Sequence, residues 1–228
     1  MSKRGKKYRE AAQKIEQGRL YTVAEAAALV KKISYSKFNA SVDLHVQLGV
    51  DPRNADQQVR GTVMLPHGTG KTKRVAVFAR DERAAEAREA GADIVGGDDL
   101  VEKVREGFLE FDACVSTPDM MREVGKLGKV LGPRGLMPNP KAGTVTNDLA
   151  AAIEAVKGGQ VEYRLDRTAV IHMCIGKVGF TAQQIADNLN SILEALWKAK
   201  PASAKGKYFK NVTVVATMSP GIPITYGV

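Results

Sequence analysis

The amino-acid sequence predicts two domains of different fold class: an α+β domain assembled from both ends of the chain, and an α/β domain inserted between them. Strand-like alternation occurs in residues 1–66 and returns in residues 160–228. Residues 67–159 instead alternate short apolar runs with helical segments, and the formal charge divides in the same way. A chain of 228 residues is long enough for two domains of modest size.

The N-terminal part contains one predicted helix and two predicted strands. Residues 22–25, Thr-Val-Ala-Glu, have the form of a capping box, and apolar residues follow at helical spacing. Residues 42–48 alternate between apolar and polar side chains, which indicates a strand with one buried face. Residues 59–65 are a second candidate strand, which ends at Pro66.

The middle of the chain predicts βαβ units. Buried strands are expected at residues 75–79 and 113–115, and a turn, short strand and turn at residues 91–97. Helices are expected at residues 81–90 and 98–106. Because strands alternate with helices, we expect a small parallel sheet with helices on its faces.

The C-terminal part returns to a strand-rich pattern. Residues 161–165 and 169–175 are predicted strands joined by a polar turn. Residues 181–198 predict a long amphipathic helix, which ends before Pro201, and residues 212–218 predict a final strand. The simplest assembly places strands from both ends of the chain in one antiparallel-rich sheet with covering helices.

The basic excess of the chain belongs to its two ends. The net charge is +9, from 34 Lys and Arg against 25 Asp and Glu. Residues 1–66 carry 12 cations and 6 anions, residues 160–228 carry 8 and 4, and residues 67–159 carry 14 and 15. This distribution suggests a polyanionic partner, either nucleic acid or an anionic membrane surface.

Several classes of protein are disfavoured by composition. No apolar run approaches the roughly 20 residues that cross a bilayer, and the basic N-terminus is not followed by an apolar segment. The two cysteines, Cys114 and Cys174, are far apart, which suits a reducing cytoplasm better than a disulfide framework.

Motifs for enzymatic chemistry are incomplete. Residues 68–72, Gly-Thr-Gly-Lys-Thr, resemble the end of a phosphate-binding loop, but Leu65 stands where the first glycine is required and a strand-like run follows. No glycine-rich fingerprint follows the first strand of the middle domain, and the three histidines do not form a metal-ligand pattern with the cysteines. We therefore expect no enzymatic activity, no cofactor and no metal.

The segment 131–144 is an unusual loop with three glycines and three prolines. Proline stiffens such a loop and glycine lets its backbone approach a partner closely, while Arg134 and Lys141 supply positive charge. Because long loops without secondary structure usually have a function, we predict a contact role for it.

Several stretches of the chain carry a resemblance to a known family. The chain resembles the bacterial large-subunit ribosomal proteins of the lateral stalk, the family called "L-one". The matching stretches are Lys37-Phe38 with Ser41-Val42, His45-Val46, Gly49-Val50-Asp51-Pro52-Arg53, Val59–Val63, Leu65–Gly68, Leu131–Lys141, Gly176-Lys177 with Phe180, and Thr217-Met218. The long Gly/Pro loop is the most specific of them.

This resemblance implies an RNA-binding domain at 1–66 plus 160–228 and an inserted Rossmann-like domain at 67–159. It implies binding to a stalk of the large-subunit ribosomal RNA near the exit site, and assistance to the release of deacylated transfer RNA. It also implies repression of translation through binding to the protein's own messenger RNA. The expected location is the cytoplasm, on the ribosome, with no membrane contact and no stable homo-oligomer.

The resemblance also implies which residues contact RNA. Phe38 and Met218 are expected to pack against ribose or base faces, and the hydroxyls of Ser41 and Thr217 to bond 2′-hydroxyl groups. Phosphate contacts are expected from cations, and Asp166 is expected to orient an arginine or to accept from a ribose hydroxyl. These cations are Arg53, Arg164, Arg167 and Lys177. Lys37 is expected to contact RNA next to Phe38. Ser219 and Ala169 stand where the family usually has glycine, so a contact at Ser219 is an expectation that its Cβ could alter.

Two other classes of function remain as alternatives at this level. One is an α/β enzyme that acts on a nucleotide or a phosphorylated substrate, and the other is a basic scaffold that binds acidic proteins. A steep dependence of RNA affinity on salt concentration distinguishes an RNA-binding protein from both.

Overall fold

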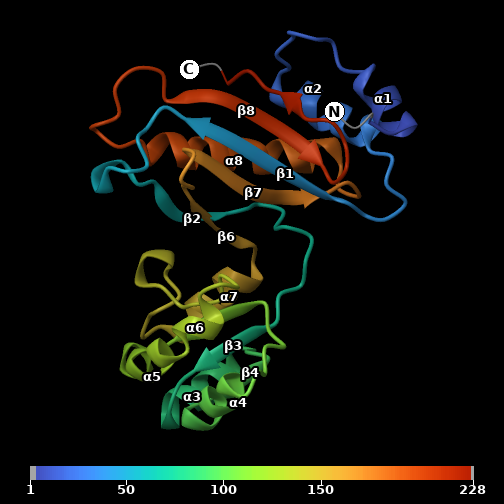
Figure 1. The fold of residues 1–228 in the computed structure, drawn as a ribbon. Helices are drawn as coiled ribbons and strands as arrows, with labels where there is room; N and C mark the ends of the chain where they lie inside the picture. Colours follow the sequence, from blue (N-terminus) through green and yellow to red (C-terminus); the bar gives the residue numbers. More distant parts are fainter. Residues whose placement is uncertain (1–3, 227–228) are drawn as a thin grey trace. The chain divides into compact units, whose positions relative to one another are not determined.

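The computed structural model describes residues 4–226, and it shows a mixed α/β protein with several sheets, as the sequence predicts (Figure 1). The chain divides into two compact units. The first contains Met1–Gly70 and Val161–Val228, and the second contains Lys71–Gln160. One hydrophobic cluster forms the core of the first unit, and two further clusters form the core of the second.

A four-stranded sheet and two long helices dominate the first unit. The elements found there are α1 (Lys6–Ala12), α2 (Val23–Ile33), β1 (Ser41–Leu48), the 3-10 helix η1 (Ala55–Gln57), β2 (Arg60–Met64), β6 (Gln160–Arg164), β7 (Val170–Lys177), α8 (Ala182–Lys198), β8 (Phe209–Ala216) and β9 (Ile222–Pro223). The strand order is β7-β1-β8-β9, and β2 pairs with β6 in a separate two-stranded sheet. Both sheets therefore join strands from the two ends of the chain.

Strand β1 lies at the centre of the larger sheet and runs antiparallel to both neighbours. Its even-numbered residues are buried and its odd-numbered residues are not, so alternation places one face against the core. On the other face His45 stands opposite His172 of β7 and Thr213 of β8. That second face is polar and solvent-accessible along β1.

Helices α2 and α8 belong to the core cluster beneath the sheet, and both begin with the capping box that their sequences contain. Thr22 accepts a bond from the amide of Glu25, and the Glu25 carboxylate accepts from the Thr22 amide at 2.9 Å. Thr181 and Gln184 repeat the arrangement at α8. Each box satisfies amide donors that the first turn of a helix leaves without partners.

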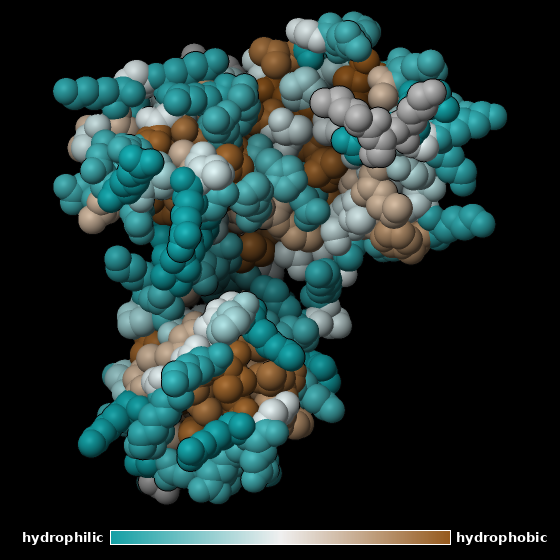
Figure 2. Space-filling view, in the orientation of Figure 1, coloured by the Kyte–Doolittle hydropathy of each residue, from teal (hydrophilic) through white to brown (hydrophobic). Residues whose placement is uncertain are grey.

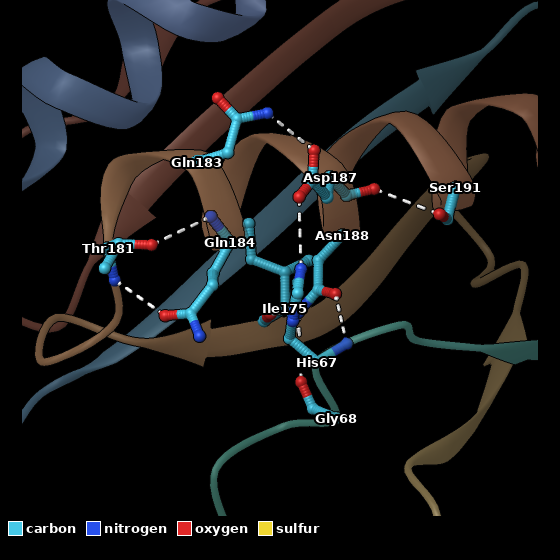
Figure 3. A network of polar contacts seen from close by, with 9 residues as sticks. All are labelled: His67, Gly68, Ile175, Thr181, Gln183, Gln184, Asp187, Asn188 and Ser191. Carbon is cyan, nitrogen blue, oxygen red and sulfur yellow. Dashed lines mark hydrogen bonds and ion pairs between the residues drawn. The ribbon is translucent and has the colours of Figure 1, made fainter.

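Asn188 of α8 is the best-buried polar side chain of the first unit, and it holds the segment by which the chain leaves that unit (Figure 3). Its Oδ1 accepts from the amide of His67 at 3.1 Å, and its Nδ2 donates to the carbonyls of Gly68 at 3.0 Å and Ile175 at 2.8 Å. The side chain is fully shielded from solvent, and its bonds join α8, β7 and the exit segment.

A three-stranded parallel sheet organises the second unit, with strand order β4-β3-β5. The elements found there are β3 (Val75–Phe78), α3 (Asp81–Glu89), β4 (Ile94–Gly96), α4 (Asp98–Arg105), β5 (Ala113–Ser116), η2 (Pro118–Met120), α5 (Met121–Lys126), α6 (Gly128–Leu131), η3 (Pro140–Ala142) and α7 (Leu149–Lys157). All four residues of β3 are buried, as expected for the central strand of a sheet covered on both faces.

The structure differs from the sequence-based expectations in three places. Helices α1, α5, α6 and α7 were not expected. Residues 131–144 are not a loop without secondary structure, because α6 ends at Leu131 and a 3-10 turn spans Pro140–Ala142. Strand β8 ends at Ala216, so Thr217 and Met218 lie in the following turn, and the short β9 is the last strand. Within the described residues no helix is long and apolar enough to span a bilayer.

Candidate RNA interface

Seven of the expected contact residues gather at one end of the four-stranded sheet, where β1 begins and β7 and β8 end (Figure 1). We call this set the first group. It consists of Lys37, Phe38, Ser41, Lys177, Thr217, Met218 and Ser219. Phe38 and Met218 are 56% and 65% exposed, so their apolar surfaces are available to a partner.

Ser41 is the centre of the first group, because it receives bonds from β7 and from the turn that follows β8. Its hydroxyl accepts from Lys177 Nζ at 2.9 Å, and its carbonyl accepts from the amide of Thr217 at 3.0 Å and from the Thr217 hydroxyl at 3.2 Å. These bonds hold three side chains in fixed positions, which lowers the entropy lost when they bind a ligand.

Met218 stands out through its backbone. Its φ is +69°, a left-handed conformation that costs a non-glycine residue roughly 1–2 kcal/mol. The hydroxyl of Tyr35 donates to its carbonyl at 2.5 Å and supports that turn. Tyr35 was not singled out from the sequence, where only its place in a polar loop next to Phe38 was visible.

Ser219 is buried, in contrast to the exposed Met218 that precedes it. Its side chain is buried, and its hydroxyl has no hydrogen-bond partner within residues 4–226. The hydroxyl therefore does not belong to the open surface formed by Phe38 and Met218. Ala169, the other residue in a position usually occupied by glycine, has φ +61° and carries the same kind of backbone strain as Met218.

A shallow apolar groove of about 530 Å³ adjoins Met218. Tyr8 and Tyr35 contribute aromatic surface, and Arg4 lies over the Tyr8 ring at 4.6 Å. Lys6 and Lys7 complete its basic edge. Sequence reasoning noted that the N-terminus is basic but did not place it beside the first group.

The remaining residues expected in the first unit form a second group at the opposite end of the sheet: Arg53, Arg164, Asp166 and Arg167. Arg164, Asp166 and Arg167 line a cavity of about 400 Å³ together with Pro52 and Gln58. Strand β1 has eight residues, so a rise of about 3.3 Å per residue separates the two groups by roughly 23 Å.

Asp166 accepts hydrogen bonds within its own turn. Its carboxylate accepts from the amide and hydroxyl of Thr168 at 2.7–2.8 Å and from the amide of Val170 at 2.8 Å, and it lies 3.3 Å from His172 Nε2. Burial raises the pKa of this carboxyl, but these hydrogen bonds outweigh burial and lower the pKa to about 2. The anion thus shapes the turn from which Arg167 extends.

His172 connects the second group with the polar face of the sheet. Its Nδ1 lies 2.8 Å from Nδ1 of His45, so the two rings share one proton between them. Burial and the neighbouring His172 lower the pKa of His45, although Asp43 opposes the shift. The neutral form of the His45 ring is therefore favoured on this face.

The expected cations of the first unit are free of competing carboxylates. Across the described residues, Lys37, Arg53, Arg164, Arg167 and Lys177 form no ion pair. Other arginines of the same unit are paired, as Arg60 is with Glu162 at 2.6 Å. Unpaired cations beside exposed apolar side chains are typical of nucleic-acid-binding surfaces.

Arg134 and Lys141 are exposed on the second unit. The segment that carries them is folded: Asn139 accepts from the Lys141 amide at 2.8 Å, and the Thr144 hydroxyl accepts from the Asn139 amide at 2.8 Å. A preorganised loop presents its charges at a lower entropic cost than a flexible one.

The described part of the chain holds no cluster of three or more metal-ligating side chains. Both cysteines are free thiols. Burial raises the pKa of Cys114 to about 12, so this thiol stays protonated and is a packing residue of the second unit.

Comparison with known proteins places the chain among ribosomal proteins. Residues 30–220 match the family described as "Ribosomal protein L1p/L10e family". The chain is 57% identical over 222 residues to the large ribosomal subunit protein uL1 of Thermobifida fusca (strain YX), which covers 97% of this chain and 94% of the relative. The same protein of Mycolicibacterium smegmatis is 56% identical over 224 residues, covering 98% and 95%, and that of Acidothermus cellulolyticus is 57% identical over 222 residues, covering 97% and 93%.

The chain therefore belongs to the ribosomal protein L1p/L10e family. The resemblance noted in the sequence is confirmed. The expectation that the chain is not an enzyme is confirmed as well, because the relatives are named as ribosomal proteins.

Proposed function

We propose that the protein is a constituent of the large ribosomal subunit that binds a stalk of the ribosomal RNA near the exit site through its first unit. The first group carries this proposal. It combines exposed Phe38 and Met218 with the unpaired cation Lys37 and with the hydroxyls of Ser41 and Thr217. Aromatic and thioether surface suits base and ribose faces, while hydroxyls suit the 2′-OH that distinguishes RNA from DNA.

In this proposal the two units have different tasks. The first unit is the RNA-binding domain, and the second is a Rossmann-like domain whose parallel sheet supports the folded segment with Arg134 and Lys141. Phosphate contacts come from Arg53, Arg164 and Arg167 of the second group and from Lys177. The names of the relatives support a cytoplasmic, ribosome-associated location and the absence of a membrane partner.

The direct test is the affinity of the full chain for a transcript of the large-subunit RNA stalk, measured over a range of salt concentrations. The slope of log affinity against log salt is expected to be steep, at about −0.7 to −0.9 for each phosphate contact. The RNA is expected to bind more tightly than a DNA duplex of the same sequence. A flat salt response, or equal affinity for the DNA, would contradict the proposal.

Matched variants locate the interface. Phe38→Ala is expected to weaken RNA binding by about 1–3 kcal/mol, the usual contribution of a stacked aromatic ring. Leu20→Ala is the control, since Leu20 is 60% exposed in the same unit but lies outside both groups. Arg134→Ala with Lys141→Ala is expected to cost less than Phe38→Ala. Equal losses for Phe38→Ala and Leu20→Ala would place the interface elsewhere.

The proposal includes two further activities that the resemblance supports. One is assistance to the release of deacylated transfer RNA from the exit site, and the other is repression of translation by binding the protein's own messenger RNA. A competition experiment tests the repression. The leader of the messenger RNA should displace the stalk transcript, and Phe38→Ala should weaken the binding of both RNAs to the same extent. A leader that binds without displacing the stalk would contradict the shared site.

A further inference from the structure

The segment 198–210 is the most strongly basic part of the first unit, and the two groups described above leave it unused. It carries five lysines and no Asp or Glu, which is more than half of the net charge of +9. We call it the lysine loop. The lysines are Lys198, Lys200, Lys205, Lys207 and Lys210, of which only Lys200 is partly buried.

The charges of the lysine loop are not neutralised by the protein. None of its five ammonium groups forms an ion pair with any carboxylate of residues 4–226. Five like charges on a short segment repel one another, and no carboxylate of residues 4–226 offsets this repulsion by pairing with them. Such an arrangement is stabilised when a polyanion binds.

An aromatic cluster holds the base of the loop in place. Trp197 packs at 6.1 Å from Tyr208 and 5.8 Å from Phe209, measured between ring centroids. Lys200 Nζ lies over the Trp197 ring at 5.4 Å, within the range of a cation–π contact. Backbone bonds add to this: the Ala204 amide donates to the Pro201 carbonyl at 3.0 Å. The lysines therefore extend from an ordered loop.

The loop lies at the same end of the sheet as the second group. Leu48 of β1 pairs with Phe209, and the next amide, that of Gly49, donates to the carbonyl of Tyr208 at 2.6 Å. The Leu48 amide donates to the carbonyl of Ala169, in the turn that carries Arg167. Three connections thus meet at this end of the sheet (Figure 1). Hydrophilic side chains dominate the same end of the unit in the space-filling view (Figure 2).

We propose that the lysine loop is a second, sequence-independent RNA-binding surface, which contacts phosphates of the same stalk RNA on the side remote from Phe38. This inference rests on the proposed function. The lysine loop lies at the same end of the sheet as Arg53, Arg164 and Arg167, and this favours RNA over an acidic protein. All eight cations would then contact phosphates along one RNA backbone. The indole of Trp197 is 37% exposed next to these cations. It offers a stacking surface that an acidic protein would not need.

The first group and the lysine loop have different roles, because roughly 23 Å separates the two ends of the sheet. The first group reads the RNA through base, ribose and 2′-OH contacts. The lysine loop adds affinity through phosphates and carries no sequence information. Its loss should weaken binding to every RNA by the same factor.

Trp197 makes the proposal directly testable, because it is the single tryptophan of the chain. When the stalk transcript binds the full chain, the fluorescence of Trp197 should change with the same midpoint as a filter-binding titration. Phe38→Ala should shift both midpoints together. A complex that forms by filter binding without any change in tryptophan fluorescence would overturn the proposal.

A charge-matched pair of variants measures the phosphate contacts. Lys205→Ala with Lys207→Ala should reduce the magnitude of the salt slope by about 0.7 to 0.9 per lysine, and should weaken binding about tenfold at low salt. Lys14→Ala with Lys103→Ala removes the same charge from exposed positions outside the proposed surface, and should leave the slope within 0.2 of the parent, on the order of the error of such slopes.

The outcomes separate this inference from the proposed function. If the parent protein does not bind the stalk transcript, the proposed function fails. If the parent binds with a steep salt slope while the Lys205/Lys207 variant keeps that slope, only the lysine-loop inference is overturned. Protection of Lys205 and Lys207, but not Lys14, from acetylation in the complex would support it.

Discussion

Replacement of Asn188 by leucine tests how the first unit holds its exit segment. Leucine has the same number and branching of side-chain heavy atoms but no polar group, so Asn188→Leu removes all three hydrogen bonds without opening a cavity (Figure 3). The bond to Ile175 is buried, and leaving a buried group without a partner costs about 1–3 kcal/mol. The two partly buried bonds, to His67 and Gly68, contribute about 0.5–1.5 kcal/mol each.

The variant no longer buries a polar amide, and the free energy saved in this way offsets part of the loss. We therefore expect the free energy of unfolding of the first unit to fall by about 2–4 kcal/mol. Urea denaturation followed by tryptophan fluorescence measures it, because Trp197 of α8 is the single tryptophan of the chain. Hydrogen exchange of the His67 amide should accelerate as well. Gln183→Ala, which removes one exposed bond to Asp187, is the control and should cost less than about 0.5 kcal/mol.

The reasoning would be refuted by two results together. One is a loss of less than about 0.5 kcal/mol for Asn188→Leu, the size of an ordinary surface substitution. The other is an unchanged exchange rate for the His67 amide. The exit segment would then be held by apolar packing alone, and the network would be incidental.

Three further predictions follow from single contacts. Tyr35→Phe removes the donor to the Met218 carbonyl and should weaken affinity for the stalk transcript about 3- to 10-fold, equivalent to about 0.5–1.5 kcal/mol. The Asp166 carboxyl should titrate near pH 2 by carbon NMR; its pKa is lowered on folding from 3.8, so its stabilising contribution is complete above about pH 4 and is lost as the pH falls through 2. Gly49→Ala places a Cβ on the carbonyl oxygen of Lys207 and should destabilise the first unit by about 1–3 kcal/mol in urea.

Each of these predictions has an outcome that would contradict it or a control variant. Unchanged affinity of the Tyr35→Phe variant would mean that the turn keeps its shape without the hydroxyl. An Asp166 midpoint at 3.8 would mean that the turn is open in solution. Gly125→Ala is the counterpart of Gly49→Ala, because its added Cβ meets no atom within 4 Å beyond its chain neighbours and the backbone of its own helix. It should be neutral or slightly stabilising, as expected for alanine in a helix.

Local patterns in the sequence predicted most of the regular structure. The capping box at Thr22 marked the start of α2, and the amphipathic pattern of residues 181–198 identified α8. Alternation in residues 42–48 identified the central strand. These signals succeed because capping and alternation depend on residues that are close in sequence. Helix α1 has no side-chain cap, so its start has no comparable signal. Helix α7 does carry such signals, because Asp148 caps it and Leu149, Ala152, Ile153 and Val156 recur at helical spacing.

The sequence by itself determined that the chain is basic at both ends, that strands from these ends fit one sheet, and that Phe38, Thr217 and Met218 resemble family contact residues. Only the tertiary structure decided how those residues are distributed. Strand register places the first group at one end of β1 and Arg53 with Asp166 at the other, because antiparallel pairing brings distant segments together in an order that local pattern does not encode. The same pairing brought Tyr35 to Met218 and the lysine loop to Gly49, and no periodicity in the chain predicts either contact.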